Sequence, residues 1–386
     1  MKKLQYITVL RALAILAVLV VHTTQTADIQ KIPEQLAGLL NNGMRGVQLF
    51  YMLSAFTLFL TYTSHSRQEL YPKRNFFIRR FFRIAPLYYL AIIYYLWQDG
   101  FGPRFWLGDA PGVSNLNILS NFLLLHSFSP RWINSVVPGG WSVGIEFVFY
   151  AMFPFIFSRI RNMQDAVNFT LITLAFRSLM LVILVHHPLM HDTRFWIDYL
   201  YLYLPDQLPV FSLGFWLYFI IYEKDKLQIS GASMLLMSLL AIAGLATQID
   251  KQIDYLIPTT FWWGLAFVAL AVGVSKYQPR ILFNPLTNYI GTISYTIYLT
   301  HFAGIHLLEY FHLTNPLKGQ GRIALLGNLA FNYTEILLTS MAISTPLYYS
   351  IEKPMQDVGK RLIARMEAAR RNRNKLDLAQ AGAPGV

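Results

Sequence analysis

Residues 4–24 read LQYITVLRALAILAVLVVHTT, an apolar run long enough to cross a bilayer as one helix. Arg11 and His22 interrupt it. Eleven residues at about 100° each make three turns plus about 20°, so both side chains share one face, roughly 16 Å apart along the axis. Such side chains are costly inside a membrane and usually mark a working site. The alternative is an Arg that snorkels to the headgroups and a His at the helix end.

The composition fixes the class of the whole chain. Hydrophobic residues make up 55% of it and charged residues only 13%, against about 25% in soluble domains. Because long apolar runs recur throughout, we predict an all-α, polytopic integral membrane protein. The chain has no cysteine, which excludes disulfides and thiol catalysis. Lys2 and Lys3 before the first run resemble a signal peptide, but Arg11 and the lack of a small-residue cleavage site favour a retained helix.

Ten spans are predicted, at 4–24, 44–63, 81–98, 141–158, 166–186, 196–221, 232–248, 257–275, 288–309 and 324–350. A shorter apolar piece, 116–128, is interpreted as a re-entrant or surface helix within an outer loop, 99–140. With ten spans, 22 of the 32 Lys and Arg residues lie on the side of both termini and 8 on the other. The positive-inside rule then makes both termini cytoplasmic. The charges of the +12 chain lie in loops and the tail, which argues against nucleic-acid binding.

This orientation predicts how deep each intramembrane polar residue lies in the bilayer. His22 lies near the outer end of the first span, Glu146 about one and a half turns below the outer start of the fourth, and His301 in the outer half of the ninth. A single intramembrane His or Glu is often structural, capping a neighbouring carbonyl. Three of them at one level indicate a functional site.

Arginines open the third span on the inner side. Arg80 and Arg83 are three residues apart, so their side chains lie on one helix face and can bind the same anion. The start of a helix also offers unpaired N–H groups and a positive dipole end, which suit phosphate. The alternative is an ordinary positive-inside anchor formed by Arg79, Arg80 and Arg83.

Six segments, in order, resemble the acyltransferase 3 family of integral membrane acyltransferases, and the similarity covers about residues 4–355. They are Arg11 and His22, with ten residues between them; Gly46-Val47-Gln48-Leu49-Phe50-Tyr51-Met52-Leu53-Ser54-Ala55-Phe56, where the family often has Gly at the position of Ala55; Arg80-Phe81-Phe82-Arg83-Ile84-Ala85-Pro86; Trp141-Ser142-Val143-Gly144-Ile145-Glu146-Phe147; Ser294-Tyr295-Thr296-Ile297-Tyr298-Leu299-Thr300-His301; and Ile351-Glu352-Lys353-Pro354. The resemblance implies acyl transfer, usually of acetyl from cytoplasmic acyl-CoA, to a hydroxyl of a sugar or glycolipid.

The residues fit that implied chemistry. Arg80, Arg83 and Arg11 are candidates to bind the phosphates of acyl-CoA, the co-substrate; no bound cofactor is expected. An acceptor hydroxyl needs a general base, for which His22 is the candidate, with Glu146 orienting it. His301 either positions the acceptor or is itself the base. Supporting residues, with Ser142 a candidate for the oxyanion, are Ser142, Trp141, Tyr298 and Ser54. No metal site is expected, because His186, His187 and His191 lack a matching carboxylate pattern.

Two units are predicted: a membrane acyltransferase domain, 1–355, and a basic cytoplasmic tail, 356–386. The basic part of the tail is expected to bind an anionic inner leaflet, and residues 376–386 are expected to be disordered. The outer loop holds five aromatic residues that suit either sugar stacking or an interfacial belt: Phe101, Phe105, Trp106, Trp132 and Trp141. We expect the plasma membrane, the inner membrane of a bacterium; a homo-oligomer is left open. The alternative functions are an acyltransferase with a cytoplasmic small-molecule acceptor and a proton-coupled transporter or flippase.

Overall fold

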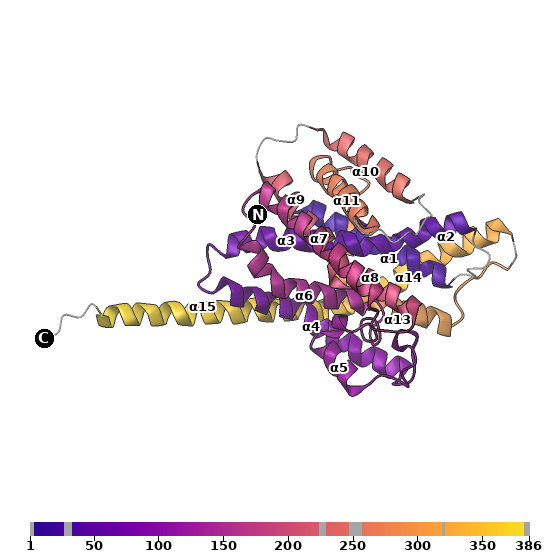
Figure 1. Ribbon diagram of the computed structural model, residues 1–386, viewed down its shortest axis with the longest axis horizontal. Coiled ribbons are helices and arrows are strands. Elements are labelled where there is room, and N and C mark those ends of the chain that lie inside the picture. Colours follow the sequence, from indigo (N-terminus) through magenta and orange to yellow (C-terminus); the bar gives the residue numbers. More distant parts are fainter. Residues whose placement is uncertain (1–3, 27–32, 224–228, 247–256, 319–320, 382–386) are drawn as a thin grey trace.

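The computed structural model describes residues 4–26, 33–223, 229–246, 257–318 and 321–381, and within them every regular element is helical. The chain is all-α, as predicted (Figure 1). The longer helices are α1 (Gln5–Thr26), α3 (Gly46–His65), α4 (Pro72–Asp99), α6 (Gly140–Phe157), α7 (Met163–His186), α9 (Leu204–Tyr222), α10 (Gly231–Ala246), α11 (Thr259–Lys276), α13 (Ser294–Tyr310), α14 (Arg322–Leu347) and α15 (Lys353–Ala381). The shorter ones are α2 (Glu34–Asn41), α5 (Asn115–Phe122), α8 (Thr193–Leu202) and α12 (Pro285–Thr292).

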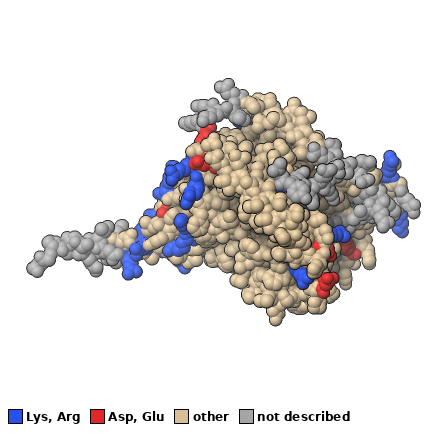
Figure 2. All heavy atoms as spheres, in the orientation of Figure 1, with Lys and Arg blue, Asp and Glu red and all other residues tan. Residues whose placement is uncertain are grey.

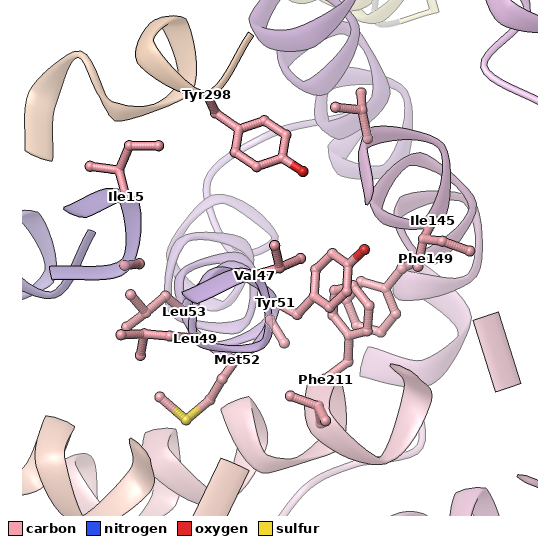
Figure 3. Close-up of a cluster of buried hydrophobic side chains, with 14 of the residues drawn as sticks. Ile15, Val47, Leu49, Tyr51, Met52, Leu53, Ile145, Phe149, Phe211 and Tyr298 are labelled. Carbon is pink, nitrogen blue, oxygen red and sulfur yellow. The ribbon is translucent and has the colours of Figure 1, made fainter. Parts of the chain in front are cut away.

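Helix α3 lies at the centre of the bundle, packed between α1 and α9. Glycine permits these close approaches: a Cβ on Gly46 would lie 2.3 Å from the Ala14 carbonyl oxygen, and one on Gly214 would lie 2.4 Å from that of Met52. Small residues let membrane helices approach in this way. On another side of α3, the ring of Phe211 stacks on Tyr51 at 4.4 Å, and Phe149 stacks on Phe211 at 4.0 Å (Figure 3). These rings fix α3, α6 and α9 relative to one another.

The surface has the character of a membrane protein. Six helical stretches are long and apolar enough to cross a bilayer: 5–24, 36–65, 140–157, 163–186, 193–222 and 259–276. Leucines on the outer faces of α7 and α10 are exposed, which suits contact with lipid tails (Leu171, Leu179, Leu236 and Leu240). On the face shown in Figure 2, Lys and Arg side chains gather where α15 leaves the bundle, and smaller groups lie at the opposite end and, beside acidic side chains, in the lower part of the view; much of the surface between them is uncharged.

Each of the ten predicted spans overlaps a helix, but two of them are broken. Span 196–221 is divided at Tyr203 into α8 and α9, because Pro205 in the first turn of α9 suits a helix start. Span 288–309 is divided at Ile293 into α12 and α13. Helices α4 and α14 are outside the group of six because polar and charged side chains lower their hydropathy, and α10 and α13 are outside it because they have only 16 and 17 residues. The count of ten spans therefore stays a prediction.

The short apolar piece 116–128 forms α5 and a following 3₁₀ turn, His126–Phe128. Eight residues of α-helix extend about 12 Å, far less than a bilayer core. The amphipathicity of α5 is inverted: Asn117, Ser120 and Asn121 are buried against the protein, whereas leucines face outward. Helix α5 is therefore a non-spanning helix with an apolar outer face.

The side chain of Arg104 connects the two ends of the loop 99–140 with the end of α4. Its guanidinium donates to the carbonyl oxygens of Ser135 and Val136, both at 3.0 Å, and to those of Tyr95 and Gly100, at 3.1 and 2.7 Å. Four bonds from one side chain join the start and the end of the loop, and this sets the position from which α6 begins.

The tail helix α15 runs back along α4 and continues beyond the bundle (Figure 1). Its buried Glu367 accepts hydrogen bonds from the backbone N–H groups of Leu70 and Tyr71, at 3.0 and 3.3 Å, and from the Asn75 amide at 2.9 Å. The tail thus caps the start of α4. Of the segment 376–386 predicted to be disordered, 376–381 continue α15 and 382–386 lie outside the described residues.

The predicted topology can be tested by single-cysteine labelling, because the chain has no cysteine to remove. One position must lie in the outer loop, but Gly112 near its middle cannot carry a cysteine, because a Cβ there would lie 2.2 Å from the Phe101 carbonyl oxygen. We therefore choose the exposed Asp109 nearby and the exposed Arg373 in the tail. In intact cells an impermeant maleimide should label Asp109→Cys and should label Arg373→Cys only after permeabilisation. Labelling of both from the same side would overturn the topology and the depths derived from it.

Candidate active site

A cavity of about 70 Å³ lies in the bundle where α1, α3, α4, α6 and α13 meet. Its polar lining residues are Arg11, Tyr51, Ser54, Thr57, Arg80, Arg83, Ser142, Glu146, Tyr150, Ser294, Tyr295 and Tyr298. Three of the residues around it, Val47, Tyr51 and Tyr298, are labelled in Figure 3. This volume is far below the about 300–1,000 Å³ of ordinary small-molecule sites. Side chains must therefore move before a substrate of ordinary size can enter.

Arg11, Arg80 and Arg83 converge on the cavity from two helices. Within the described residues, none of the three has a carboxylate oxygen within ion-pair distance, and the buried Nε of Arg80 has no hydrogen-bond partner. The Arg80 guanidinium instead lies over the rings of Phe76 and Tyr150, at 5.7 and 5.6 Å. The cations are therefore available to an anionic ligand.

Arg79 behaves differently from its neighbour Arg80. It points to the α3–α4 loop, where it donates two hydrogen bonds to the Glu69 carboxylate, at 2.6 and 3.1 Å. The predicted pair, Arg80 and Arg83, thus shares the cavity, while Arg79 anchors the loop. Rotation about the helix axis by about 100° per residue accounts for the difference.

Glu146 supplies a carboxylate to the same cavity. It accepts a hydrogen bond from the Tyr150 hydroxyl at 2.6 Å and another from the hydroxyl of Ser54. Its negative charge lies among the three arginines, which accounts for its retention in an apolar bundle. The predicted role of Glu146 in orienting His22 stays a prediction.

Ser142 and Tyr298 form a hydroxyl pair at the start of α6. Their oxygens lie 2.7 Å apart, and the Tyr298 hydroxyl donates to the Gly139 carbonyl oxygen at 2.9 Å. Gly139 has a φ of 75°, and a Cβ there would lie 3.1 Å from the Tyr298 hydroxyl, so the position requires glycine. Trp141 packs its ring edge-on against Tyr51, at 6.2 Å between centroids.

His22 and His301 come together, with ring centroids 5.0 Å apart and Phe302 packed against both. The Nδ1 of His301 lies 2.7 Å from the Tyr298 carbonyl oxygen, which can only accept. That nitrogen therefore carries the proton, and the buried Nε2 of neutral His301 is an acceptor that has no partner among the described residues.

The sequence placed His22, Glu146 and His301 at one depth. The two histidines are neighbours, whereas Glu146 lines the arginine cavity, and the described lining residues include neither histidine. Tyr298 connects the two groups, because it lines the cavity and its ring lies 5.8 Å from that of His301. The structure thus has a charged chamber and an adjacent imidazole pair.

Three residues near the site were not assigned from the sequence. Tyr150 follows Glu146 by four residues, so its place on the same helix face was a usable signal. Tyr295 donates to the Ile84 carbonyl oxygen at 3.0 Å. Glu352 accepts from Thr296 at 2.5 Å and lies near enough to Arg83 for their charges to interact; it ends a π-helical turn, which the sequence pattern does not reveal.

Comparison with known proteins identifies the family of the chain. A family profile described as an acyltransferase domain, that of the acyltransferase 3 family, matches residues 4–349. Neither the curated proteins nor the solved structures contain a match. The family match covers most of the chain, including all three arginines, Glu146 and both histidines. The chain therefore belongs to the acyltransferase 3 family and is an integral membrane acyltransferase.

Proposed function

We propose that the protein transfers an acyl group, acetyl in the first instance, from cytoplasmic acyl-CoA to a hydroxyl of a cell-surface carbohydrate or glycolipid. The observation that carries the proposal is the cavity in which Arg11, Arg80 and Arg83 have no carboxylate within ion-pair distance among the described residues. Three partly buried cations that no carboxylate contacts at ion-pair distance are costly in an apolar bundle unless a ligand neutralises them. A CoA carries phosphates and a thin pantetheine arm, which suit a charged but narrow chamber.

The donor is proposed to enter from the end of the bundle where α4 begins and α15 lies. The positive side chains in this region (Figure 2) attract a polyanion, and Arg80 and Arg83 lie two to three turns into α4. Arg11 lies about two turns into α1 and lines the same chamber from a second helix. With the phosphates on the arginines, the arm extends toward Ser142 and Tyr298 and brings the thioester near the imidazole pair.

In the proposed chemical step, His22 takes the proton of the acceptor hydroxyl, and the oxygen attacks the thioester carbonyl carbon. The new C–O bond forms, the C–S bond breaks, and the leaving thiolate receives the proton from the imidazolium. His301 positions the acceptor through its Nε2, and the hydroxyls of Ser142 and Tyr298 stabilise the developing oxyanion. Glu146 holds Ser54 and Tyr150 around the donor. We place the reaction in the plasma membrane of a bacterium.

The proposal predicts that surface glycans of a deletion strain lose a set of acetyl esters that the wild type carries. Mass spectrometry of glycans with and without mild alkaline de-esterification measures the difference. In parallel, purified protein in nanodiscs should bind acetyl-CoA and release CoA only slowly without an acceptor. Unchanged glycan esters would reject the cell-surface acceptor, and no binding of acetyl-CoA would reject the donor.

A further inference from the structure

A second cavity, of about 470 Å³, lies in the outer loop, outside the charged chamber. Its lining includes Phe101, Ser114, Asn117, Arg131 and Trp132. Phe101 and Arg131 are exposed and form its rim, whereas Asn117 is fully buried. Its volume lies within the range of small-molecule sites, about 300–1,000 Å³.

The lining combines two aromatic rings with hydrogen-bonding groups. Apolar ring faces suit the C–H faces of a pyranose, and the Arg131 guanidinium donates well to hydroxyls. Asn117 accepts bonds through its side-chain oxygen from Ser135, at 2.9 Å, and Asn121, at 3.0 Å. Its amide nitrogen is a buried donor that has no partner among the described residues. An unsatisfied buried donor next to an open cavity indicates a ligand that accepts hydrogen bonds.

The other loop aromatics have different neighbours. Phe105 packs against Phe195 of α8 at 5.0 Å, and Trp106 packs against the same ring at 6.2 Å. Trp141 packs inside the bundle, against Tyr51. Of the five aromatic residues noted in the sequence, only Phe101 and Trp132 line this cavity.

Helix α5 forms one wall of the cavity through Ser114 and Asn117, and its opposite face is apolar and exposed. The leucines of that face are Leu116, Leu119 and Leu123. Figure 1 shows α5 set off from the bundle, below α4 in this view. A lipid chain can lie along these leucines while a headgroup occupies the cavity.

Hydrogen bonds connect the cavity to the active site. Asn121 bonds to Asn117, Tyr88 donates to Asn121 at 3.1 Å, and Tyr88 also lies 3.2 Å from the Nε2 of His126. That Nε2 lies 2.9 Å from the Gly140 carbonyl oxygen, in the first turn of α6, which carries Ser142 and Glu146. Burial lowers the pKa of His126 to about 4, although its bond to Gly140 acts in the opposite direction, so the ring is a neutral donor at neutral pH.

We infer that this cavity holds the sugar ring of a lipid-linked acceptor, stacked between Phe101 and Trp132, with its lipid chain along the leucine face of α5. The inference rests on the proposed function and adds how the acceptor is presented: from the membrane, beside α6. The bonded path from Asn117 to Gly140 fixes the cavity relative to the hydroxyl pair at the start of α6.

The test is photo-crosslinking in nanodiscs with dodecyl β-D-glucoside, β-D-galactoside and β-D-mannoside, each carrying a diazirine on the sugar. Mass spectrometry should locate the label of at least one probe between residues 101 and 132. Trp132→Ala should raise the probe concentration for half-maximal labelling about tenfold, as for loss of a central aromatic contact. The matched control is Trp97→Ala, because Trp97 is 79% exposed on α4 and does not line the cavity.

A second pair of measurements tests the lipid part. The double variant Leu119→Asn/Leu123→Asn should weaken labelling by the dodecyl probes but not by the matching methyl glycosides. Label spread over the bundle without enrichment at 101–132, or labelling unchanged in folded Trp132→Ala, would overturn the inference. Acetyl-CoA binding is measured on the same samples: if it persists while labelling fails, the acceptor site alone is wrong, and if it fails while labelling persists, the proposed function is wrong.

Discussion

Replacing His22 by alanine is expected to lower the rate of acyl transfer by about 10²–10⁴-fold, the usual cost of a lost general base. Acetyl-CoA binding should stay near the wild-type value, because the described lining of the arginine cavity does not include His22. Transfer is measured with labelled acetyl-CoA, and donor binding by equilibrium methods on the same purified protein. The matched control is His306→Ala, since His306 is exposed on α13, five residues from His301.

The ring contact between His22 and His301 makes the second histidine the direct rival. His301→Ala should impair transfer less than His22→Ala and raise the KM for the acceptor, since its proposed role is to position that substrate. Glu146→Gln should also be impaired, and the double variant His22→Ala/Glu146→Gln should be little worse than the worse single one, because residues that act as a unit are not additive. Wild-type transfer by folded His22→Ala would exclude His22 as the base and make His301 the leading candidate.

Hydropathy and periodicity predicted the helical class and a helix at every proposed span, because both depend on local sequence. They did not predict the breaks at Tyr203 and Ile293. The second break lies beside a close approach that sequence does not reveal: a Cβ on Gly291 would lie 1.9 Å from the Thr8 carbonyl oxygen of α1. Such contacts join residues almost 300 positions apart.

The sequence likewise predicted only part of the arrangement of the candidate site. Spacing along a helix gave the shared face of Arg80 and Arg83, and depth in the membrane gave the neighbourhood of His22 and His301. Depth is only one coordinate, however, and the lateral position of Glu146 depends on how α6 packs against α3 and α4. The aromatic stack through Phe211 sets that packing, and no local pattern encodes it.

Replacing Arg83 by alanine is expected to weaken acetyl-CoA binding about tenfold or more, because a charge-assisted hydrogen bond contributes roughly 1.5–3 kcal/mol. Arg80→Ala should act in the same direction, and Arg83→Lys should recover part of the affinity by keeping the charge. The control within the same helix is Arg79→Ala, since Arg79 pairs with Glu69 and does not line the cavity.

A second acyl donor distinguishes a loss of phosphate binding from a general loss of structure in the Arg83→Ala protein. S-Acetylpantetheine carries the thioester but no phosphate, so its kcat/KM should change little in Arg83→Ala, while that of acetyl-CoA falls. The loss should also shrink as ionic strength rises, because salt screens the field that attracts the phosphates. Equal losses with both donors would place Arg83 in folding or in the chemical step, and unchanged acetyl-CoA affinity in a folded Arg80→Ala/Arg83→Ala protein would return both residues to the role of a topology anchor.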